Sequence, residues 1–368
     1  MATTYHAEHV GSLLRPPYLL RAREAHETGE LTTAQLHEVE DRAIAELLDI
    51  QEQAGLTVFT DGEARRESWR AGLLESLGGV EPASRTLRWY RNGKELSPEE
   101  TLSDGAVAVA TVSRKQDLTG VEATFMAARA PGTFKITMIS ASMGGMIWDR
   151  ERSSAVYPAP NDLIEDLAAS RSTRSAAWPP GASAGSSSTR SATTRFDPGA
   201  TGRTRAALTP EQALDAAITV DSKIVTAVKS EHQDLTVGMH ICRGNYRSSW
   251  MAQGGYEPVA ERLFNEVPVD RFLLEYDTER AGGFEPLRFV PPGPTVVLGL
   301  VTTKVPQLET RDDLLRRIDE AARYAPLKQL ALSPQCGFAS GSLGNLITVD
   351  DERRKLDLVV SVAAQVWG

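Results

Sequence analysis

The chain has 368 residues, of which 24% are charged and 41% hydrophobic, and its 40 basic and 49 acidic side chains give a net charge of −9. This composition is typical of a globular protein with a large core, and the negative charge disfavours a nucleic-acid-binding surface. No apolar run reaches the roughly 18 residues of a membrane helix, and residues 1–15 lack the layout of a signal peptide. Two cysteines exclude a disulfide framework. We therefore expect a cytoplasmic enzyme without nucleic-acid or membrane partners.

Helical patterns and short β-rich runs alternate along the chain. Strands are predicted over residues 6–10, 56–60, 107–112, 134–139, 235–242, 271–276, 295–301 and 329–333. Helices are predicted over residues 33–54, 121–129, 213–228, 258–265 and 310–324, with a further helix beginning at 162–167. Thr209, Pro210 and Gln212 match an N-cap, an N1 proline and a capping box.

This alternation indicates parallel strands joined by right-handed crossovers. The eight runs and one further strand position within residues 168–207 make nine candidates for the eight places of a (β/α)8 barrel, so one strand is expected outside it. An open doubly wound sheet is the alternative, but no glycine-rich dinucleotide loop follows any strand. We predict one α/β domain over residues 1–368, a TIM barrel, with residues 71–104 as surplus length.

The segment 168–207 differs from the rest of the chain in composition. It contains no Leu, Ile, Val or Met, and no Asp or Glu occurs between Leu167 and Phe196. Such a segment cannot bury enough apolar surface to offset its ordering entropy. We therefore expect residues 168–207 to be anomalous and disordered, in the region where the fifth strand belongs.

Two cysteines and a histidine lie at predicted strand ends. His240 and Cys242 project from the same face at the carboxyl end of one strand, as two zinc ligands require. Cys336 follows another strand, and barrel enzymes place their active sites at that end. The alternative is that both thiols are buried small apolar groups.

Further polar residues end other predicted strands. Glu275 is a candidate oxygen ligand, with Asp277 as its rival; the alternative for Glu275 is an ion pair with an arginine such as Arg280. Glu63 ends the second strand and Gly11-Ser12 ends the first. Taken singly, a turn around Glu63 and a helix cap at Ser12 are the simpler interpretations.

Four motifs in this order resemble the catalytic barrel of cobalamin-independent methionine synthase and its single-barrel relatives. They are HVGSLLRP at 9–16, DGEARR at 61–66, HIC at 240–242 and PQCG at 334–337, and the likeness spans almost the whole chain. The resemblance implies that His240, Cys242, Glu275 and Cys336 bind Zn²⁺. It also implies that Ser12 and Glu63, with Gly11 beside them, hold the amino-acid end of homocysteine.

The function that the resemblance implies is zinc-dependent transfer of a methyl or other alkyl group to a thiol, with homocysteine converted to methionine. A thiol and an alkyl donor are the expected partners. Single-barrel relatives include epoxyalkane:coenzyme M transferases, so alkylation of coenzyme M is the enzymatic alternative. An inactive zinc-binding homologue is the third possibility.

The family also carries a Gln-hydrophobic-Asp-Glu motif at the end of the fifth strand, and its Asp binds the substrate amino group. Residues 186–190 are Ser-Ser-Ser-Thr-Arg instead. Codons reread one base early permit Val-Gln-Leu-Asp-Glu-Val over residues 186–191. We hypothesise two compensating frame disruptions, opening near residues 169–174 and closing between 197 and 208; a natural insertion is the alternative.

Overall fold

The structure is a computed structural model that describes residues 5–68, 77–84, 87–101, 104–115, 118–172, 182–187 and 209–368. The α-helices in these ranges are α1 (Pro17–Glu27), α2 (Thr33–Gln53), α4 (Leu118–Arg129), α5 (Pro160–Ser172), α6 (Pro210–Glu231), α7 (Glu257–Glu266), α8 (Arg311–Ala321) and α9 (Val349–Trp367). The strands are β1 (Val58–Phe59), β2 (Leu77–Ser84), β3 (Tyr90–Arg91), β4 (Lys94–Glu95), β5 (Asp104–Arg114), β6 (Thr133–Ile139), β7 (Ala182–Ser187), β8 (Val237–Ile241), β9 (Arg271–Glu275), β10 (Thr295–Val301) and β11 (Leu330–Pro334). None of the described helices meets the length and hydropathy that a membrane span requires.

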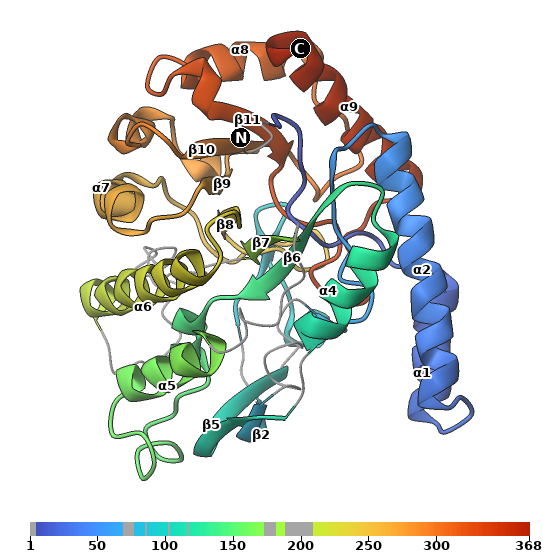
Figure 1. Cartoon of the computed structure of the whole chain (residues 1–368), viewed down its shortest axis with the longest axis vertical. Coiled ribbons are helices and arrows are strands. Elements are labelled where there is room, and N and C mark those ends of the chain that lie inside the picture. The colour runs from blue at the N-terminus through green and yellow to red at the C-terminus, as the bar shows by residue number, and fades with distance from the viewer. Residues whose placement is uncertain are drawn as a thin grey trace.

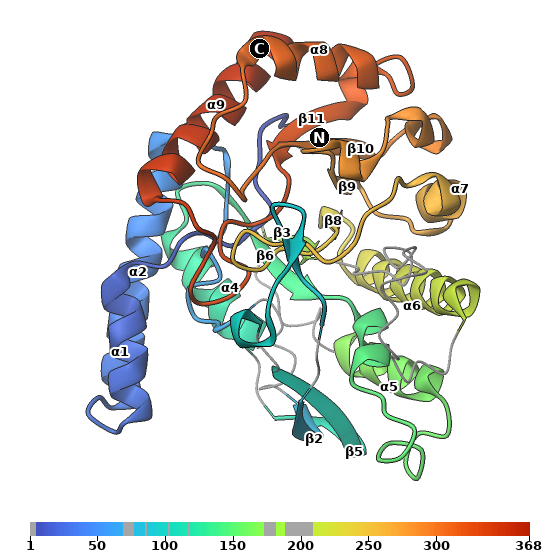
Figure 2. The same ribbon diagram turned by 180° about the vertical axis from the view of Figure 1, so that it is seen from behind.

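A parallel sheet organises the molecule. Within the described ranges it has seven strands in the order β1-β6-β7-β8-β9-β10-β11, and all neighbouring strands run parallel. Parallel neighbours need long crossover connections, and helices supply most of them, so that helices lie around the strands (Figures 1 and 2). The predicted α/β class is confirmed.

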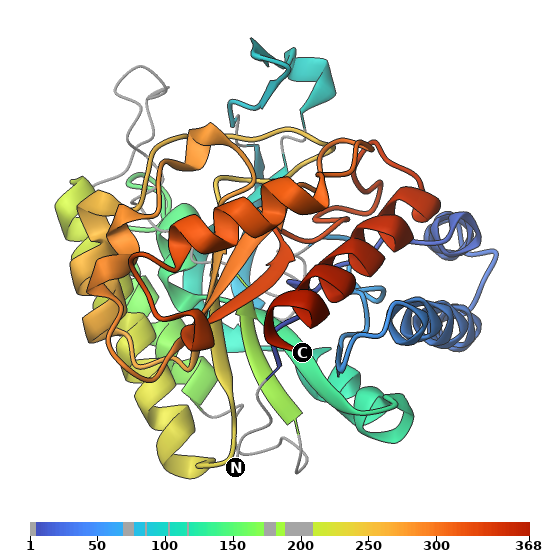
Figure 3. The same ribbon diagram turned by 90° about the horizontal axis from the view of Figure 1, so that it is seen from above.

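The segment of residues 6–10 runs along the last strand of the sheet. Ala7 and Leu332 form a parallel bridge. The amide of Glu8 donates to the carbonyl of Leu332 at 3.2 Å, and the amide of Leu332 donates to the carbonyl of His6 at 2.8 Å. On the outside, the blue helix α2 and the red helix α9 lie side by side (Figures 1 and 3). The beginning and the end of the described chain therefore meet beside β11.

Strand β10 illustrates why the buried strands are continuously apolar. Val296 and Leu298 belong to the large core cluster that the strands share with helices α6 to α9. Val297 points the other way and packs against Val10, Leu273 and Ala331 in a second, smaller cluster. A strand that is covered on both faces has no polar side, which explains the unbroken run from Thr295 to Val301.

The predicted strand 107–112 lies outside the parallel sheet. It forms the middle of β5, which pairs antiparallel with β2, and the short strands β3 and β4 form a separate antiparallel pair. One strand outside the central sheet was expected. Residues 71–104 were predicted to be surplus to the barrel, but the strands β2, β3 and β4 within them were not predicted.

Most predicted helices are confirmed to within a few residues. The capping box before α6 is present, with the amide of Gln212 donating to Thr209 Oγ1 at 3.2 Å and the amide of Thr209 donating to Gln212 Oε1 at 2.9 Å. Helices α1 and α9 were not predicted, although Thr348 caps α9 through a box with Asp351.

The compositionally anomalous segment 168–207 falls mainly outside the described residues. Within it the structure describes the end of α5 and the strand β7, which pairs in parallel register with β6 and β8. Residues 173–181 and 188–208 lie outside the described ranges. The frame-disruption hypothesis concerns the whole segment, described and undescribed residues alike, and it stays a hypothesis.

A buried charge cluster connects the amino-terminal parts of the strands. The carboxylate of Glu8 is 1% exposed, receives a hydrogen bond from Lys135 of β6 at 2.9 Å and one from Arg271 of β9 at 2.7 Å. Burial alone would raise the pKa of Glu8, but the charges of Arg271 and Lys135 lower it from 4.5 to about 2. One carboxylate thus ties β6 and β9 to the N-terminal segment.

We expect Glu8→Gln to lower the free energy of unfolding by about 3 kcal/mol, because it leaves Lys135 and Arg271 buried without a counter-charge. Since the pKa of Glu8 is lower in the folded chain, its contribution exists above pH about 4.5 and is lost as the pH falls toward 2. Urea unfolding from pH 7 to pH 3 measures both effects. Glu257→Gln, which removes an exposed pair with Arg288, is the control and should lower the free energy of unfolding much less, because water and salt screen an exposed pair. Equal losses in the two variants would contradict the role of Glu8.

Candidate functional site

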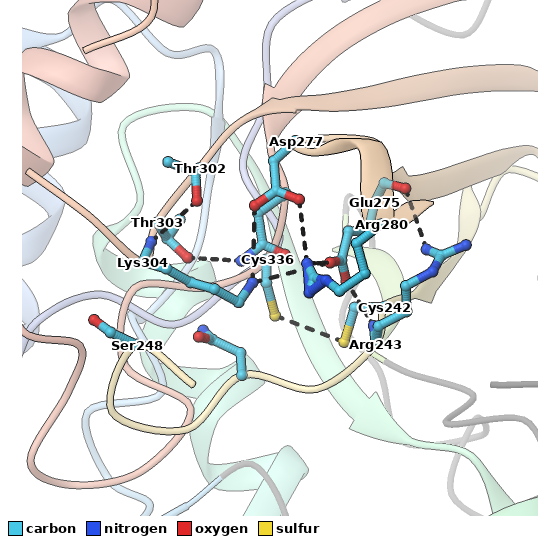
Figure 4. Close-up of polar contacts among 12 residues, drawn as sticks. Cys242, Arg243, Ser248, Glu275, Asp277, Arg280, Thr302, Thr303, Lys304 and Cys336 are labelled. Carbon is cyan, nitrogen blue, oxygen red and sulfur yellow. Dashed lines mark hydrogen bonds and ion pairs between the residues drawn. The ribbon is translucent and has the colours of Figure 1, made fainter. Parts of the chain in front are cut away.

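The structure brings His240, Cys242 and Cys336 together at the carboxyl end of the sheet. His240 lies in β8, Cys242 directly follows it, and Cys336 lies two residues beyond β11. The candidate ligand atoms lie within 4.8 Å of one another, and the two Sγ atoms are 4.0 Å apart (Figure 4). Two thiolates on one tetrahedral zinc ion, each about 2.3 Å from it, lie about 3.8 Å apart. The spacing fits a zinc site.

The histidine is oriented for a metal by its second ring nitrogen. His240 Nδ1 lies 3.0 Å from the carbonyl oxygen of Leu273, which selects the tautomer that carries its proton on Nδ1. Nε2 is buried and has no hydrogen-bond partner among the described residues. A buried nitrogen lone pair without a partner, next to two thiols, is the arrangement that a metal ligand requires.

The two thiols have unfavourable surroundings without a cation. The hydrogen bond to Cys242, followed by burial, raises the pKa of Cys336 well above its ordinary value. Both side chains are buried, so water cannot stabilise two thiolates there. A divalent cation would supply the missing counter-charge and displace the thiol protons.

Glu275 lies beside this cluster but not within the group of atoms that satisfies the metal geometry. Its Oε2 accepts a hydrogen bond from the amide of Arg243 at 2.5 Å, and its Oε1 accepts one from the guanidinium of Arg280. The ion pair with Arg280 is the arrangement that was the alternative at the sequence level. Asp277 lies 3.4 Å from the same guanidinium and 3.9 Å from Lys304 Nζ, so it too pairs with cations.

The carboxylate of Glu63 lies next to Gly11, just after the segment 6–10. Its Oε1 accepts a hydrogen bond from Thr137 Oγ1 at 2.8 Å, whereas Oε2 is buried without a partner in the described ranges. Gly11 allows this approach, since a Cβ there would lie 3.1 Å from Glu63 Oε1 and 2.5 Å from the methyl of Thr137. The residue at 11 must therefore lack a side chain.

Ser12 is joined to the loop that carries Cys336. Its Oγ accepts a hydrogen bond from the amide of Ala339 at 3.3 Å. A Cβ on Gly337 would lie 1.9 Å from that Oγ, so only glycine fits beside Ser12. Because Gly337 is the neighbour of Cys336, the structure brings the predicted substrate-binding residues close to the predicted metal ligands.

Two site residues were missed at the sequence level. Lys304 follows β10, is 8% exposed, and its Nζ lies 4.0 Å from Glu275 Oε1 (Figure 4). Asn245 donates from Nδ2 to the carbonyl of Gly337 at 2.7 Å and so connects the loops that carry the two cysteines. The position of Lys304 at a strand end was a usable signal, whereas the contact of Asn245 has no local signature.

The chain is similar to proteins of known sequence and structure, although no family model matches it. It is 36% identical to each of two uncharacterized Bacillus subtilis proteins, YxjH over 370 residues and YxjG over 379, covering 99% of this chain and 95% of each relative. A Listeria monocytogenes protein with the provisional name of vitamin-B12-independent methionine synthase superposes with a TM-score of 0.72 at 26% identity, covering 100% of this chain and 99% of that one.

A vitamin-B12-independent methionine synthase from Shewanella sp. W3-18-1, solved in complex with selenomethionine, shares the fold with a TM-score of 0.72 at 18% identity, covering 99% of this chain and 98% of that one. The agreement extends over whole chains rather than over one motif. The chain belongs to the family of YxjH and YxjG, and at family level it is related to the cobalamin-independent methionine synthases.

Proposed function

We propose that this protein transfers a methyl or other alkyl group to a thiol in a zinc-dependent reaction, with homocysteine as the acceptor. The observation that carries the proposal is the buried set of His240, Cys242 and Cys336, with the lone pair of Nε2 unpartnered and the two sulfurs 4.0 Å apart. The relationship to methionine synthases supports the same reaction class.

We infer that the scaffold is a (β/α)8 barrel in one domain. Residues 6–10, the first predicted strand, would join the seven parallel strands and bring their number to eight. The bridge of Ala7 to β11 supports one side of this closure. On the other side, the hydroxyl of Thr60, directly after β1, donates to the carbonyl of Gly11 at 2.6 Å. In a closed barrel the carboxyl ends of all strands surround one site, as the positions of Ser12, Glu63 and Cys336 require.

The residues of the site divide the chemistry between them. A zinc ion held by His240, Cys242 and Cys336 would supply Lewis acidity, which lowers the pKa of an acceptor thiol toward neutral pH. The sulfur lone pair then forms a bond to the alkyl carbon while the bond from that carbon to the donor breaks, and the donor keeps the electron pair. Glu63 Oε2, buried and unpartnered, would accept a hydrogen bond from the ammonium group of an amino acid thiol.

A second acceptor is favoured by one observation. Lys304 is buried, and its Nζ makes no hydrogen bond within the described part of the chain, so it could receive an anionic group such as the sulfonate of coenzyme M. Glu63 would then have no ammonium to bind. The Glu63 carboxylate thus favours an acceptor with an ammonium group, whereas the Lys304 ammonium group favours an acceptor with a sulfonate.

We expect the purified chain to contain one zinc ion and Cys242→Ala to lose most of it. Loss of a residue that only hydrogen-bonds to a metal ligand weakens metal binding by up to about 100-fold, so loss of one of the three ligands itself should weaken zinc binding by more than that. Metal analysis after dialysis against a chelator measures the content, with Glu257→Gln as a surface control. A wild-type chain without zinc would refute both the active and the inactive zinc-binding interpretations.

We expect Glu63→Gln to raise KM for homocysteine by about 10- to 100-fold, because a charged hydrogen bond of about 1.5–3 kcal/mol is lost. The same variant should leave the use of coenzyme M unchanged. Lys304→Met provides the opposite case, since it should impair an acceptor with a sulfonate more than it impairs homocysteine. Thiol alkylation with the two acceptors in competition measures both. A larger loss for coenzyme M than for homocysteine in Lys304→Met would establish the alternative acceptor.

The proposal for residues 170–196 is a disrupted reading frame. We expect the nucleotide sequence of these codons to encode a Gln-hydrophobic-Asp-Glu motif in another frame, and the frame-corrected protein to alkylate homocysteine faster than the chain as written. Sequencing of the gene and the thiol-alkylation assay test the two parts. Codons that cannot encode the motif in any frame would leave a natural insertion as the explanation.

A further inference from the structure

We propose that Thr137 is a positioning residue that fixes the orientation of the Glu63 carboxylate and thereby makes the site selective for acceptor thiols that carry an ammonium group. The inference rests on the proposed function, in which Glu63 binds the amino-acid end of the acceptor. Thr137 lies in β6, two residues before the strand ends at Ile139. It belongs to none of the four motifs that carry the family resemblance.

The hydroxyl group of Thr137 lies between a cation and a carboxylate. Arg66 Nη1 donates a hydrogen bond to Thr137 Oγ1 at 3.0 Å, and Thr137 Oγ1 donates one to Glu63 Oε1 at 2.8 Å. A guanidinium group can only donate, whereas a hydroxyl group has one proton and two lone pairs. Because Arg66 occupies a lone pair of Oγ1, the single proton of Thr137 is directed to Glu63.

Arg66 is held firmly enough to fix that direction. Its Nε donates to Glu122 Oε1 at 2.7 Å and its Nη2 pairs with Glu122 Oε2, which is the geometry of a bidentate ion pair. Nη2 also donates to the carbonyl oxygen of Thr137 at 2.8 Å. The three side chains are buried, and Glu122 belongs to α4, which lies beside β6 (Figures 1 and 2). An ion pair shielded from water, together with a bond to the strand backbone, leaves the guanidinium group little freedom.

The hydrogen bond to Oε1 determines which oxygen of Glu63 is available. Oε1 is engaged by Thr137, whereas Oε2 is buried and has no partner among the described residues. A buried oxygen without a donor costs free energy, which a donor on the acceptor molecule recovers. An ammonium group is such a donor, since it carries three protons and no lone pair. Without the Thr137 hydroxyl, no side-chain hydrogen bond in the described part of the chain would hold the carboxylate in this orientation.

The backbone of Glu63 is fixed independently of Thr137. Its φ of 56° lies in the left-handed region, which residues with a side chain rarely adopt. The amide of Glu63 donates to Asp61 Oδ1 at 2.9 Å, and the carbonyl oxygen accepts a hydrogen bond from Arg15 Nη2 at 3.0 Å. Residues held in this region concentrate at functional sites, where the surrounding contacts maintain the strain. The backbone is thus held on both sides, and the direction of the carboxylate depends on Thr137.

The methyl group of Thr137 faces the other element that is predicted to bind the acceptor. A Cβ built on Gly11 would lie 2.5 Å from Thr137 Cγ2, so the methyl group packs against the backbone of Gly11. One side chain therefore contacts both Gly11, which precedes Ser12, and Glu63. Valine would keep the methyl contact and lose the hydrogen bond, whereas serine would keep the hydrogen bond and lose a methyl group. This difference allows the role of the hydroxyl to be measured separately.

The test compares the full zinc-loaded chain with its variants Thr137→Val and Thr137→Ser. The ligands are homocysteine and 4-mercaptobutanoate, which has the same thiol, chain length and carboxylate but no ammonium group. Calorimetry measures both dissociation constants, and the alkylation assay measures KM and kcat. We expect Thr137→Val to weaken homocysteine binding by about tenfold, the lower effect of one hydrogen bond to a charged group, and to change 4-mercaptobutanoate binding by less than about twofold.

The serine variant should restore selectivity. Thr137→Ser should bind homocysteine within about threefold of wild type, because it retains the hydroxyl. In Thr137→Val, KM for homocysteine should rise while kcat stays the same, since the lost interaction does not involve the reacting atoms. Thr137→Ala, compared with Thr137→Ser, isolates the hydroxyl in a shorter side chain and decides the case if Thr137→Val does not fold. Thr124→Val, which removes an exposed hydroxyl that donates to the carbonyl of Gly120, is the matched control and should leave both dissociation constants unchanged.

A double variant tests whether Thr137 acts through Glu63. In a Glu63→Gln chain, Thr137→Val should cause no further loss of homocysteine affinity, because the carboxylate that the hydroxyl orients is already absent. A further loss of the same size as in wild type would show that the hydroxyl acts elsewhere and would overturn the proposal.

Equal losses of affinity for the two ligands in Thr137→Val, or an unchanged affinity for homocysteine, would also overturn it. If that variant fails to fold, the same outcomes in Thr137→Ala relative to Thr137→Ser have this meaning. A wild-type chain that neither binds nor alkylates homocysteine refutes the proposed function and with it the role of Thr137. Wild-type binding and alkylation with an unaltered Thr137→Val variant refute only the role of Thr137.

Discussion

The thiols of Cys242 and Cys336 share one buried position because the strands that precede them end at the same edge of a parallel sheet. Ninety-four residues separate them in sequence, yet their sulfurs are 4.0 Å apart. Parallel pairing from β8 through β9 and β10 to β11 sets this approach, and the hydrogen bond from Asn245 to the carbonyl of Gly337 holds the two loops together. Every other property of the site depends on this meeting of strand ends.

The two ends of the sheet differ in how their buried charges are satisfied. Near the amino-terminal end, Glu8 is paired with Lys135 and Arg271, and both of its oxygens accept hydrogen bonds. At the carboxyl end, buried polar atoms such as Nε2 of His240 and Oε2 of Glu63 have no partner in the described structure. Fully paired charges stabilise a fold, whereas unpaired polar atoms in a buried site cost free energy that a ligand can recover. The unpartnered atoms of His240 and Glu63 therefore mark the carboxyl end as the place where a ligand can bind.

The sequence predicted those parts of the structure that have a local pattern. The alternation in residues 235–242 placed His240 and Cys242 on one face, and Thr209 with Gln212 marked the start of α6. A strand position was expected within residues 168–207, but the bounds of β7 were not, because its residues, Ala182–Ser187, carry no β-branched or aromatic side chains. The contacts of Asn245 and the stacking of Trp250 on Tyr90 join segments that are distant in sequence, so no periodicity of the sequence predicts them. The choice of Glu275 between a metal and Arg280 depends likewise on three-dimensional proximity.

The contact between Gly337 and Ser12 has a consequence for substrate size. Gly337 adjoins Cys336, and a single Cβ at 337 would collide with the hydroxyl of Ser12, so backbone packing sets the separation between the predicted metal ligands and Ser12. If Ser12 and Glu63 hold the amino-acid end of the acceptor while its sulfur reaches the metal, that separation selects acceptors by the number of carbon atoms between the amino-acid group and the sulfur. An acceptor one methylene shorter than homocysteine would then have to strain or lose one of the two attachments. One methylene is worth about 1–3 kcal/mol of discrimination, enough to distinguish homocysteine from cysteine by length alone.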